Sequence, residues 1–342
     1  MKKILILGAG SMGSAFSVPC IENKNDVYLC GTHLENDFID NLKNNNNFHS
    51  TLGALLPNNL KINKFENLNE IFKNKIDIVV VGVSSLGVEW FSREISKYYK
   101  EGTPIILLTK GLAIEKNKII TLSEKISNIL IQKGFKNINI SAIKGPCLAA
   151  GLANKIRTST LIASNDIVQA KNLQKIITTN YYSTETSEDL NGVELCGAIK
   201  NIYSMLIGAS EGLSSQSKDN KIKSKYFHNT AASLIHKSVS EMSKFVKHYG
   251  GKQDTVYGLA GLGDLYVSAI GGRNSQMGKY LGEGYLYKDA KEKFMNEVTV
   301  EGAELAIEVG PIIKENLNKK DFPLMMSIID CICDNKKLEI SW

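Results

Sequence analysis

Short runs of branched aliphatic residues alternate with helix-like segments in the first half of the chain. The first run lies at residues 4–7 and is followed at once by glycines. Strands that alternate with helices form mostly parallel sheets with helices on both faces, so the pattern predicts an α/β, doubly wound fold whose ligands bind at the carboxyl ends of the strands. Further runs occur at residues 27–30, 76–85, 103–112, 138–146 and 157–164.

From about residue 190 the pattern changes to a helical period that continues to the C-terminus, as in TAASLIHKSVSEMSKFVKHYG. We therefore expect an α/β domain at residues 1–189 and an all-helical C-terminal domain at residues 190–342, opened by a helix. Within the second domain, residues 214–225 are polar and rich in Lys and Ser. That composition is typical of a mobile surface loop or lid.

Composition and charge exclude several classes of protein. Hydrophobic residues make up 43% and charged residues 22% of the 342 positions, as in soluble globular proteins. The net charge of +6 is spread along the chain, whereas nucleic-acid binding needs clustered Lys and Arg, so we expect no nucleic-acid partner. No stretch approaches the roughly 20 apolar residues that span a bilayer, and glycines interrupt the N-terminal run too early for a secretory signal.

The six cysteines show neither a zinc nor a redox spacing; the nearest two form only a C-x-C at Cys331 and Cys333. The others stand in apolar surroundings, where a free Cys behaves as a small hydrophobe. Free thiols indicate a reducing compartment, so we expect a cytoplasmic protein that inserts into no membrane.

The glycines after the first apolar run form the pattern G-x-G-x-x-G at Gly8, Gly10 and Gly13, with small and apolar residues after them. In a strand–turn–helix context the first glycine permits the tight turn and the second lets backbone approach a pyrophosphate. The third allows close packing of helix and strand. The motif predicts a Rossmann-like NAD(P)-binding domain; a purely structural glycine-rich turn is the alternative.

The end of the second strand bears on the choice between NAD and NADP. In NAD-specific sites an acidic residue at this tip holds the ribose hydroxyls. Here the tip reads Gly31-Thr32-His33, and Glu35 and Asp37 lie further along. His33 could contact a 2′-phosphate or could be an ordinary loop histidine, so the cofactor preference stays open.

Other polar residues follow strands or stand among glycines. Lys110 and Gly145 each follow an apolar run, where a ligand or plain solvent could lie. The glycine-dense segment 258–284 carries Asp264, which could serve a site or cap a helix. Its Arg273-Asn274 pair could clamp a phosphate or stand at the surface.

Lys200 is the one cation in the apolar stretch VELCGAIKNIYSMLIGASEGL, residues 193–213. A helix that is apolar all round is normally buried, and Lys is almost never buried without a partner. The side chain could reach solvent along the helix surface. Alternatively the helix is a rigid, water-poor platform that holds one amine at a site.

Taken together, these residues resemble the NAD(P)-dependent glycerol-3-phosphate dehydrogenase family over nearly the whole chain. The resemblance rests on GAGSMGSA, LLTKGL, KGPCLA, VELCGAIKNIYSMLIGASEGL, GLAGLGDL, GGRN and VEGA, which occur in the family's order. It implies a Rossmann-like domain followed by an all-helical domain, NAD or NADP as cofactor, no metal ion, a small phosphorylated substrate and a homodimer.

The resemblance also implies roles for particular positions. Lys200 would be the proton donor or acceptor, with Asp264 and Lys110 as further catalytic residues. The cofactor would be held by Gly8, Gly10, Ser11, Met12, Gly13, His33, Lys110, Gly145, Cys147, Ala149, Arg273 and Glu301. The substrate would be held by Lys110, Gly145, Lys200, Asn201, Asn229, Asp264, Gly272, Arg273 and Asn274.

The implied reaction is reversible hydride transfer between NAD(P)H and dihydroxyacetone phosphate, giving sn-glycerol 3-phosphate for phospholipid synthesis. The chain departs from the family's pattern at Met12, Ser84, Cys147 and Gly151 and in the longer segment 214–225. These departures keep open a larger ketose or polyol phosphate as substrate. A non-catalytic dinucleotide-binding sensor is the alternative from another class of function.

Overall fold

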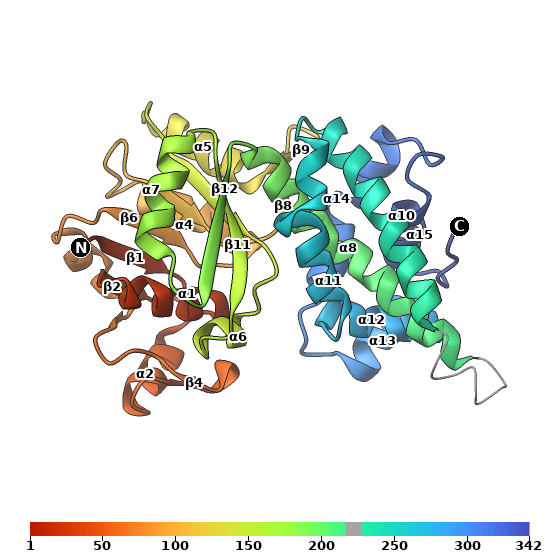
Figure 1. The fold of residues 1–342 in the computed structure, drawn as a ribbon, viewed down its shortest axis with the longest axis horizontal. Coiled ribbons are helices and arrows are strands. Elements are labelled where there is room, and N and C mark those ends of the chain that lie inside the picture. The colour runs from red at the N-terminus through yellow and green to blue at the C-terminus, as the bar shows by residue number, and fades with distance from the viewer. Residues whose placement is uncertain (217–226, 342) are drawn as a thin grey trace. The chain divides into compact units, whose positions relative to one another are not determined.

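The structure is a computed structural model and describes residues 1–216 and 227–341. Most of the loop expected at residues 214–225 lies outside the described residues. The chain divides into two compact units: Met1–Lys110 with Leu122–Leu190, and Gly111–Thr121 with Asn191–Trp342. Each unit is described by itself below (Figure 1).

An eight-stranded sheet with the order β12-β11-β10-β7-β6-β1-β2-β5 is the centre of the first unit (Figure 1). All neighbouring strands pair in parallel except β10 and β11, which are antiparallel. The predicted fold class, a mostly parallel doubly wound sheet followed by helices, is confirmed. The strands are β1 (Lys3–Leu7), β2 (Asp26–Cys30), β5 (Lys61–Asn63), β6 (Ile78–Val81), β7 (Ile105–Leu107), β10 (Ile140–Lys144), β11 (Thr158–Ser164) and β12 (Tyr182–Ser187).

The strand order reverses at β1. From β1 the chain proceeds to β2 and β5 on one side, and then returns to β6 on the other. A switch of this kind leaves a crevice outside the carboxyl ends of the two central strands, where ligands of doubly wound sheets bind. Gly8 follows β1 and Gly82 follows β6, so the glycine motif stands at the switch.

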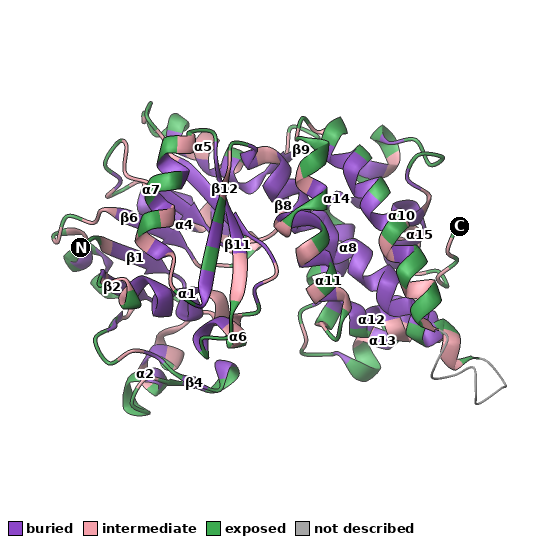
Figure 2. Ribbon diagram, viewed as in Figure 1, coloured by how far each residue is buried: buried purple, intermediate pink, exposed green. Residues whose placement is uncertain are grey.

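Helices cover the sheet, and the apolar residues between helix and strand form the core of the unit (Figure 2). Phe16 of α1 is 1% exposed and its ring meets Tyr182 of β12 edge to face, which fixes the helix across several strands. The helices are α1 (Ser11–Glu22), α2 (Asn36–Asn44), α3 (Leu68–Phe72), α4 (Val88–Ile95), α5 (Leu122–Gln132), α6 (Ala149–Ala153) and α7 (Ile167–Ile177).

Two small hairpins accompany the large elements. Strands β3 (Phe48–His49) and β4 (Ala54–Leu55) pair in the first unit. Strands β8 (Leu112–Glu115) and β9 (Lys118–Thr121) pair with each other and contact a helix of the second unit, α14 (Glu301–Asn316). The hairpin therefore belongs to the second unit, although it lies in the part of the chain, residues 1–189, that the sequence prediction gave to the α/β domain.

Apart from that hairpin, the described part of the second unit is helical. Its longest helix, α8, is buried over most of its length (Figure 2). No helix among the described residues is long and apolar enough to cross a membrane. The helices are α8 (Leu190–Ser215), α10 (Phe227–His248), α11 (Asp264–Ala269), α12 (Arg273–Gly282), α13 (Tyr287–Phe294), α14 and α15 (Pro323–Cys333).

Helices α8 and α12 pack with their backbones in contact. A Cβ placed on Gly278 of α12 would lie 1.8 Å from the carbonyl oxygen of Met205, and one on Gly212 of α8 would lie 2.0 Å from that of Lys279. A Cβ on Gly208 or on Gly282 would lie 2.2 Å from a carbonyl oxygen of the opposite helix. Glycines four residues apart on both helices thus allow the close approach. It brings the N-terminal half of α8 near the start of α12, where the polar residues of the site stand.

Candidate active site

Lys200 of α8 is buried, with 4% of its surface exposed, and forms an ion pair inside the second unit. Its Nζ lies 2.9 Å from Oδ1 of Asp264, which is 1% exposed, and also donates to Oγ of Ser268. The alternative that Lys200 reaches solvent along the helix is therefore wrong. A buried ion pair is expensive to desolvate, so it is weak evidence for stability and invites a functional explanation.

The local sequence explains how Asp264 arrives at this amine. Residues Leu259–Gly263 form a π-helical turn in which Gly261 packs against the backbone of Val256, with no space for a Cβ. Asp264 then opens α11, and Ser268 follows one helical turn later on the same face. The sequence interpretation missed Ser268. Its i, i+4 spacing from Asp264 is the signal that could have revealed it.

Next to Lys200 on α8, Asn201 begins a chain of hydrogen bonds across three helices. Nδ2 of Asn274 donates to Oδ1 of Asn201 at 3.1 Å, and Oδ1 of Asn274 accepts from the backbone N–H of Gly302 at 2.8 Å. Nδ2 of Asn201 donates to Oε2 of Glu301 at 3.4 Å. This network orients both asparagine amides, since each has a defined donor side and acceptor side.

Arg273 lies at the open end of this network. Its guanidinium donates to Oε1 of Glu301 at 2.9 Å, and the two side chains are 55% and 46% exposed. Gly272 is the N-cap of α12, with extended backbone before Arg273. The structure thus brings together most of the residues that the sequence assigned to the helical domain. Asn229, by contrast, is exposed in the first turn of α10, and within the described residues it is not joined to this network.

In the first unit the glycine motif adopts the geometry that the sequence predicted. Gly8 has φ +110°, and a Cβ on Gly13 would lie 2.2 Å from the carbonyl oxygen of Gly8. A Cβ on Gly10 would meet nothing within 4 Å, so the loop is open there. Ser11 begins the twelve-residue helix α1, whose first N–H groups have no intrahelical partner and attract an anion. These residues fit a bound dinucleotide pyrophosphate.

An acidic side chain lies at the tip of β2, contrary to the sequence interpretation. Glu35 is five residues beyond the strand, but the chain turns back at Thr32. Oε2 of Glu35 accepts from the backbone N–H of Thr32 at 2.7 Å and from that of Ala9, inside the glycine loop, at 3.1 Å. His33 is exposed and its ring packs 5.1 Å from that of Trp90. The carboxylate therefore stands beside the loop, where the ribose of a dinucleotide is held in such folds.

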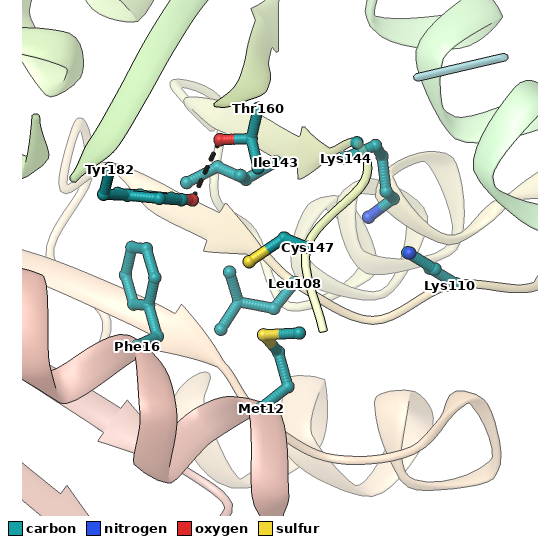
Figure 3. Close-up of a pocket in the computed structure, with 10 residues that line it drawn as sticks. Met12, Phe16, Leu108, Lys110, Ile143, Lys144, Cys147, Thr160 and Tyr182 are labelled. Atoms are coloured by element: carbon teal, nitrogen blue, oxygen red, sulfur yellow. Dashed lines mark hydrogen bonds between the residues drawn. The ribbon is translucent and has the colours of Figure 1, made fainter. Parts of the chain in front are cut away.

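A pocket opens in the first unit among the carboxyl ends of β7 and β10 and the start of α1 (Figure 3). Met12, Lys110, Gly145 and Cys147 line it, as the sequence assignment of these residues to one site requires. Ala149 is partly buried against the apolar core beside them. The other lining residues are Phe16, Leu108, Ile143, Lys144, Thr160 and Tyr182.

The arrangement supports acid–base chemistry on a phosphorylated polar molecule. In the second unit, a paired amine lies near asparagine amides and an arginine. In the first unit, a glycine loop and a lysine-bearing pocket suit a dinucleotide. Among the described residues no group of three or more His, Cys, Asp and Glu side chains gathers that could hold a metal ion. All six cysteines are free thiols, and burial raises the pKa of Cys30 to about 12.

Comparisons with known proteins match one family over nearly the whole sequence. Residues 3–170 match the family model described as NAD-dependent glycerol-3-phosphate dehydrogenase N-terminus, and residues 189–341 match the model of its C-terminus. An NADP(+)-dependent glycerol-3-phosphate dehydrogenase of Archaeoglobus fulgidus is 30% identical over 98% of this chain and 96% of its own. A glycerol-3-phosphate dehydrogenase [NAD(P)+] of Fusobacterium nucleatum is 29% identical over the full length of both.

A solved structure gives the same result. The crystal structure of glycerol-3-phosphate dehydrogenase from Coxiella burnetii superposes with a TM-score of 0.82 at 27% identity, covering 98% of this chain and 96% of that one. Family models match both halves of the sequence, and relatives align with it over nearly its whole length. The chain belongs to the NAD-dependent glycerol-3-phosphate dehydrogenase family.

Proposed function

We propose that the chain catalyses reversible hydride transfer between NAD(P)H and dihydroxyacetone phosphate, giving sn-glycerol 3-phosphate. The observation that carries the proposal is the buried Lys200–Asp264 pair next to oriented asparagine amides, in a chain that belongs to this family of oxidoreductases. A sensor that only binds dinucleotide would have no use for a buried ion pair of this kind.

Lys200 is the proposed acid in the reducing direction. NAD(P)H, when bound, supplies the hydride to the ketone carbon. The ammonium of Lys200 polarises the ketone oxygen as negative charge develops there and gives it the proton; in the reverse direction the amine takes the proton back. Asp264 and Ser268 fix the direction in which Nζ points.

The phosphate is assigned to the open end of the same network. Arg273 offers a planar fork of donors that suits phosphate, and Gly272 leaves the backbone at the helix start accessible. Asn274 and Asn201 place the rest of the substrate, since their amides are held on both sides. Asn229 stays a candidate only through the family resemblance.

The first unit is assigned to the cofactor. The Gly8–Gly13 loop and the start of α1 hold the pyrophosphate of the cofactor. Another part of the cofactor, or part of the substrate, occupies the pocket lined by Met12, Lys110, Gly145 and Cys147. Lys110 is a candidate for contact with both cofactor and substrate. Glu301 and Ala149 keep the cofactor roles that the resemblance implies.

The carboxylate of Glu35 is expected to influence the choice between NADH and NADPH. Glu35→Gln keeps the shape and an acceptor for the two backbone N–H groups but removes the negative charge near the ribose. We expect the affinity for NADPH relative to NADH to rise by about fivefold, because repulsion of a 2′-phosphate at close range in water amounts to about 1 kcal/mol. Fluorescence titration of both reduced cofactors measures the ratio.

Asp37→Asn is the matched control, since Asp37 is an exposed carboxylate two residues further on. It should leave the NADPH-to-NADH affinity ratio at the wild-type value. Equal ratios for the Glu35→Gln variant and the wild type would show that Glu35 has no part in cofactor choice.

The departures at Met12, Ser84, Cys147 and Gly151 motivate a second candidate, the same chemistry on a larger ketose or polyol phosphate. The test is NAD(P)H oxidation with dihydroxyacetone phosphate and with a panel of longer ketose phosphates. The leading proposal expects dihydroxyacetone phosphate to have the highest kcat/KM. If it is inert while a longer sugar phosphate turns over, the second candidate replaces it.

The physiological setting is part of the proposal. The product, sn-glycerol 3-phosphate, would enter phospholipid synthesis. A cytoplasmic location agrees with the six free thiols. The homodimer implied by the family resemblance stays a prediction, and light scattering of the purified chain tests it.

A further inference from the structure

Lys291 of α13 has no part in the mechanism proposed above, yet its amine is held on three sides. The side chain is partly buried. Its Nζ donates to the backbone carbonyl oxygens of Met295 at 2.7 Å, Asn296 at 2.8 Å and Val298 at 2.9 Å. An ammonium group has three N–H donors, so these acceptors use all of them. Ordering a lysine side chain to this extent costs conformational entropy, which invites an explanation.

Two of the acceptors lie beyond the cap of the helix. Helix α13 ends at Phe294 with Met295 as its C-cap, and residues 296–300 form the rest of the loop that leads to α14. A lysine in the last turn of a helix commonly stabilises the helix's own final carbonyl groups. The amine of Lys291 reaches further and also binds the carbonyl oxygens of the following loop. It therefore fixes the course of that loop relative to α13.

The loop ends at the candidate active site. Oε1 of Glu301, the first residue of α14, accepts from Arg273 at 2.9 Å. The N–H of Gly302 donates to Oδ1 of Asn274 at 2.8 Å. A Cβ on Gly302 would lie 2.3 Å from the carbonyl oxygen of Asn201, so the start of α14 lies directly against the backbone of α8. A small shift of the loop would therefore move groups that orient the proposed substrate-binding residues.

The helix that carries the lysine is itself anchored. The ring of Phe294 stacks on that of Tyr280 of α12, with centroids 4.3 Å apart and an interplanar angle of 15°. Tyr285 meets the ring of Phe294 edge to face at 5.1 Å. Helix α12 begins with the residues assigned to the substrate phosphate. Lys291 thus joins the loop to a helix pair that is fixed at the site.

We propose that Lys291 is a positioning residue for the reaction. Its ammonium holds the loop of residues 295–300, so that Glu301 and the N–H of Gly302 lie where they orient the side chains at the start of α12. The inference rests on the proposed function for the identity of the reaction. The link from the lysine to the start of α14 rests on contacts within the second unit alone.

A helix cap that only stabilises the fold is the competing explanation. Removal of such a cap would lower the fraction of folded protein, so that kcat would fall and KM would not change. Removal of a positioning residue alters the site in protein that is still folded. Because the phosphate is assigned to Arg273 and the start of α12, a displaced site should show chiefly in the KM of the substrate.

The test compares two lysines of the same helix. Lys291→Met keeps the unbranched apolar stem and removes the charge and the donors, whereas Lys291→Arg keeps the charge and several donors. Lys293→Met is the control, because Lys293 is exposed and its Nζ lies over the rings of Tyr285 and Phe294, 5.6 and 5.1 Å from their centroids. It removes the same charge and leaves the contacts with the loop in place.

Two quantities are measured for each variant. Hydrogen exchange followed by mass spectrometry reports the protection of residues 296–303, and steady-state kinetics give KM and kcat for dihydroxyacetone phosphate. We expect Lys291→Met to speed exchange and to raise KM by about tenfold each, since it removes three charge-assisted hydrogen bonds. The kcat should fall by less than about threefold. Lys291→Arg should recover most of both effects, and Lys293→Met should stay within about twofold of the wild type.

Three results would overturn the proposal. Faster exchange with an unchanged KM would show that the loop does not position the site. A raised KM with unchanged exchange would mean that Lys291 acts by another route. Unchanged exchange and kinetics, in a variant that melts like Lys293→Met, would leave the lysine without a positioning role. Lys291→Gln, which retains amide donors, takes the place of Lys291→Met in these measurements if the latter does not fold.

Failure of the proposed function would look different. A wild-type protein that turns over no ketose phosphate would contradict that function. In this case the exchange of residues 296–303 alone decides whether Lys291 positions the start of α14. Faster exchange in Lys291→Met would support the positioning role, and exchange equal to that of Lys293→Met would refute it.

Discussion

Lys200→Met is expected to lower kcat by about 10³-fold or more while the affinity for NAD(P)H stays within about twofold of the wild type. A positioned general acid contributes about 10²–10⁴-fold, and loss of the charge that stabilises the developing oxyanion adds a comparable factor. The glycine loop and the pocket that suit the cofactor belong to the other unit, so they should keep their structure. Steady-state turnover and fluorescence titration measure the two effects separately.

A loss of stability must be distinguished from a loss of chemistry. Removing Lys200 takes its ion-pair partner from the buried Asp264, and breaking a buried ion pair on one side costs about 3–5 kcal/mol. The double variant Lys200→Met with Asp264→Asn removes both charges and should recover most of the unfolding free energy. Its kcat should stay at the level of the single variant.

The double variant also decides between the two roles. If it recovered turnover together with stability, Lys200 would be a structural residue and the proposed acid would lie elsewhere. If the single variant lost cofactor binding at wild-type stability, the separation of roles between the two units would be wrong.

The sequence singled out Lys200 as a candidate acid–base residue but did not show what surrounds it. An apolar helix with one cation shows that the amine is unusual, yet it leaves burial and exposure equally open. Asp264 is 64 residues away along the chain. No spacing rule connects α8 with α11, so only the family resemblance paired the two residues. Ser268, by contrast, could have been predicted from local sequence, because it lies four residues after Asp264 on the same helix and therefore on the same face.

Elements with weak local signals were missed for physical reasons. Strand β12 reads YSTETS, and a polar strand at the edge of the sheet lacks the apolar run that marks buried strands. The β8–β9 hairpin turns at Lys116 and Asn117, which both have positive φ. Two-residue hairpin turns with positive φ usually contain Asn-Gly or Asp-Gly, and the pair Lys-Asn does not indicate such a turn. Glu35 was misplaced because the sequence showed only its distance along the chain from the strand.

The close packing of α8 and α12 could not be predicted from glycine content either. The sequence contains Gly208 and Gly212 on one helix and Gly278 and Gly282 on the other, but the same residues also occur in flexible loops. What makes them structural is that each one faces a carbonyl oxygen of the opposite helix. The site depends on this contact, because α8 carries Lys200 and Asn201 while α12 begins with Arg273 and Asn274.

Gly278→Ala is therefore expected to destabilise the second unit by about 3 kcal/mol or more and to lower its thermal midpoint by about 10 °C. The added methyl group would lie 1.8 Å from the carbonyl oxygen of Met205 and 2.9 Å from its Cα. These are backbone atoms inside a helix, so no rotation of a side chain can relieve the clash. The helices must move apart, which shifts Lys200 relative to Asn274 and lowers kcat along with stability.

Gly151→Ala is the matched control for this substitution. Gly151 lies within α6, and a Cβ there would meet only the Cβ of Ile156 at 3.8 Å, an ordinary contact. Because alanine favours helix by about 1 kcal/mol over glycine, this variant should melt at or slightly above the wild-type temperature. Calorimetric scans of both variants test the argument. If Gly278→Ala melted like Gly151→Ala, helices α8 and α12 would have space for an added methyl group. Their backbone contact would then not determine the positions of the site residues.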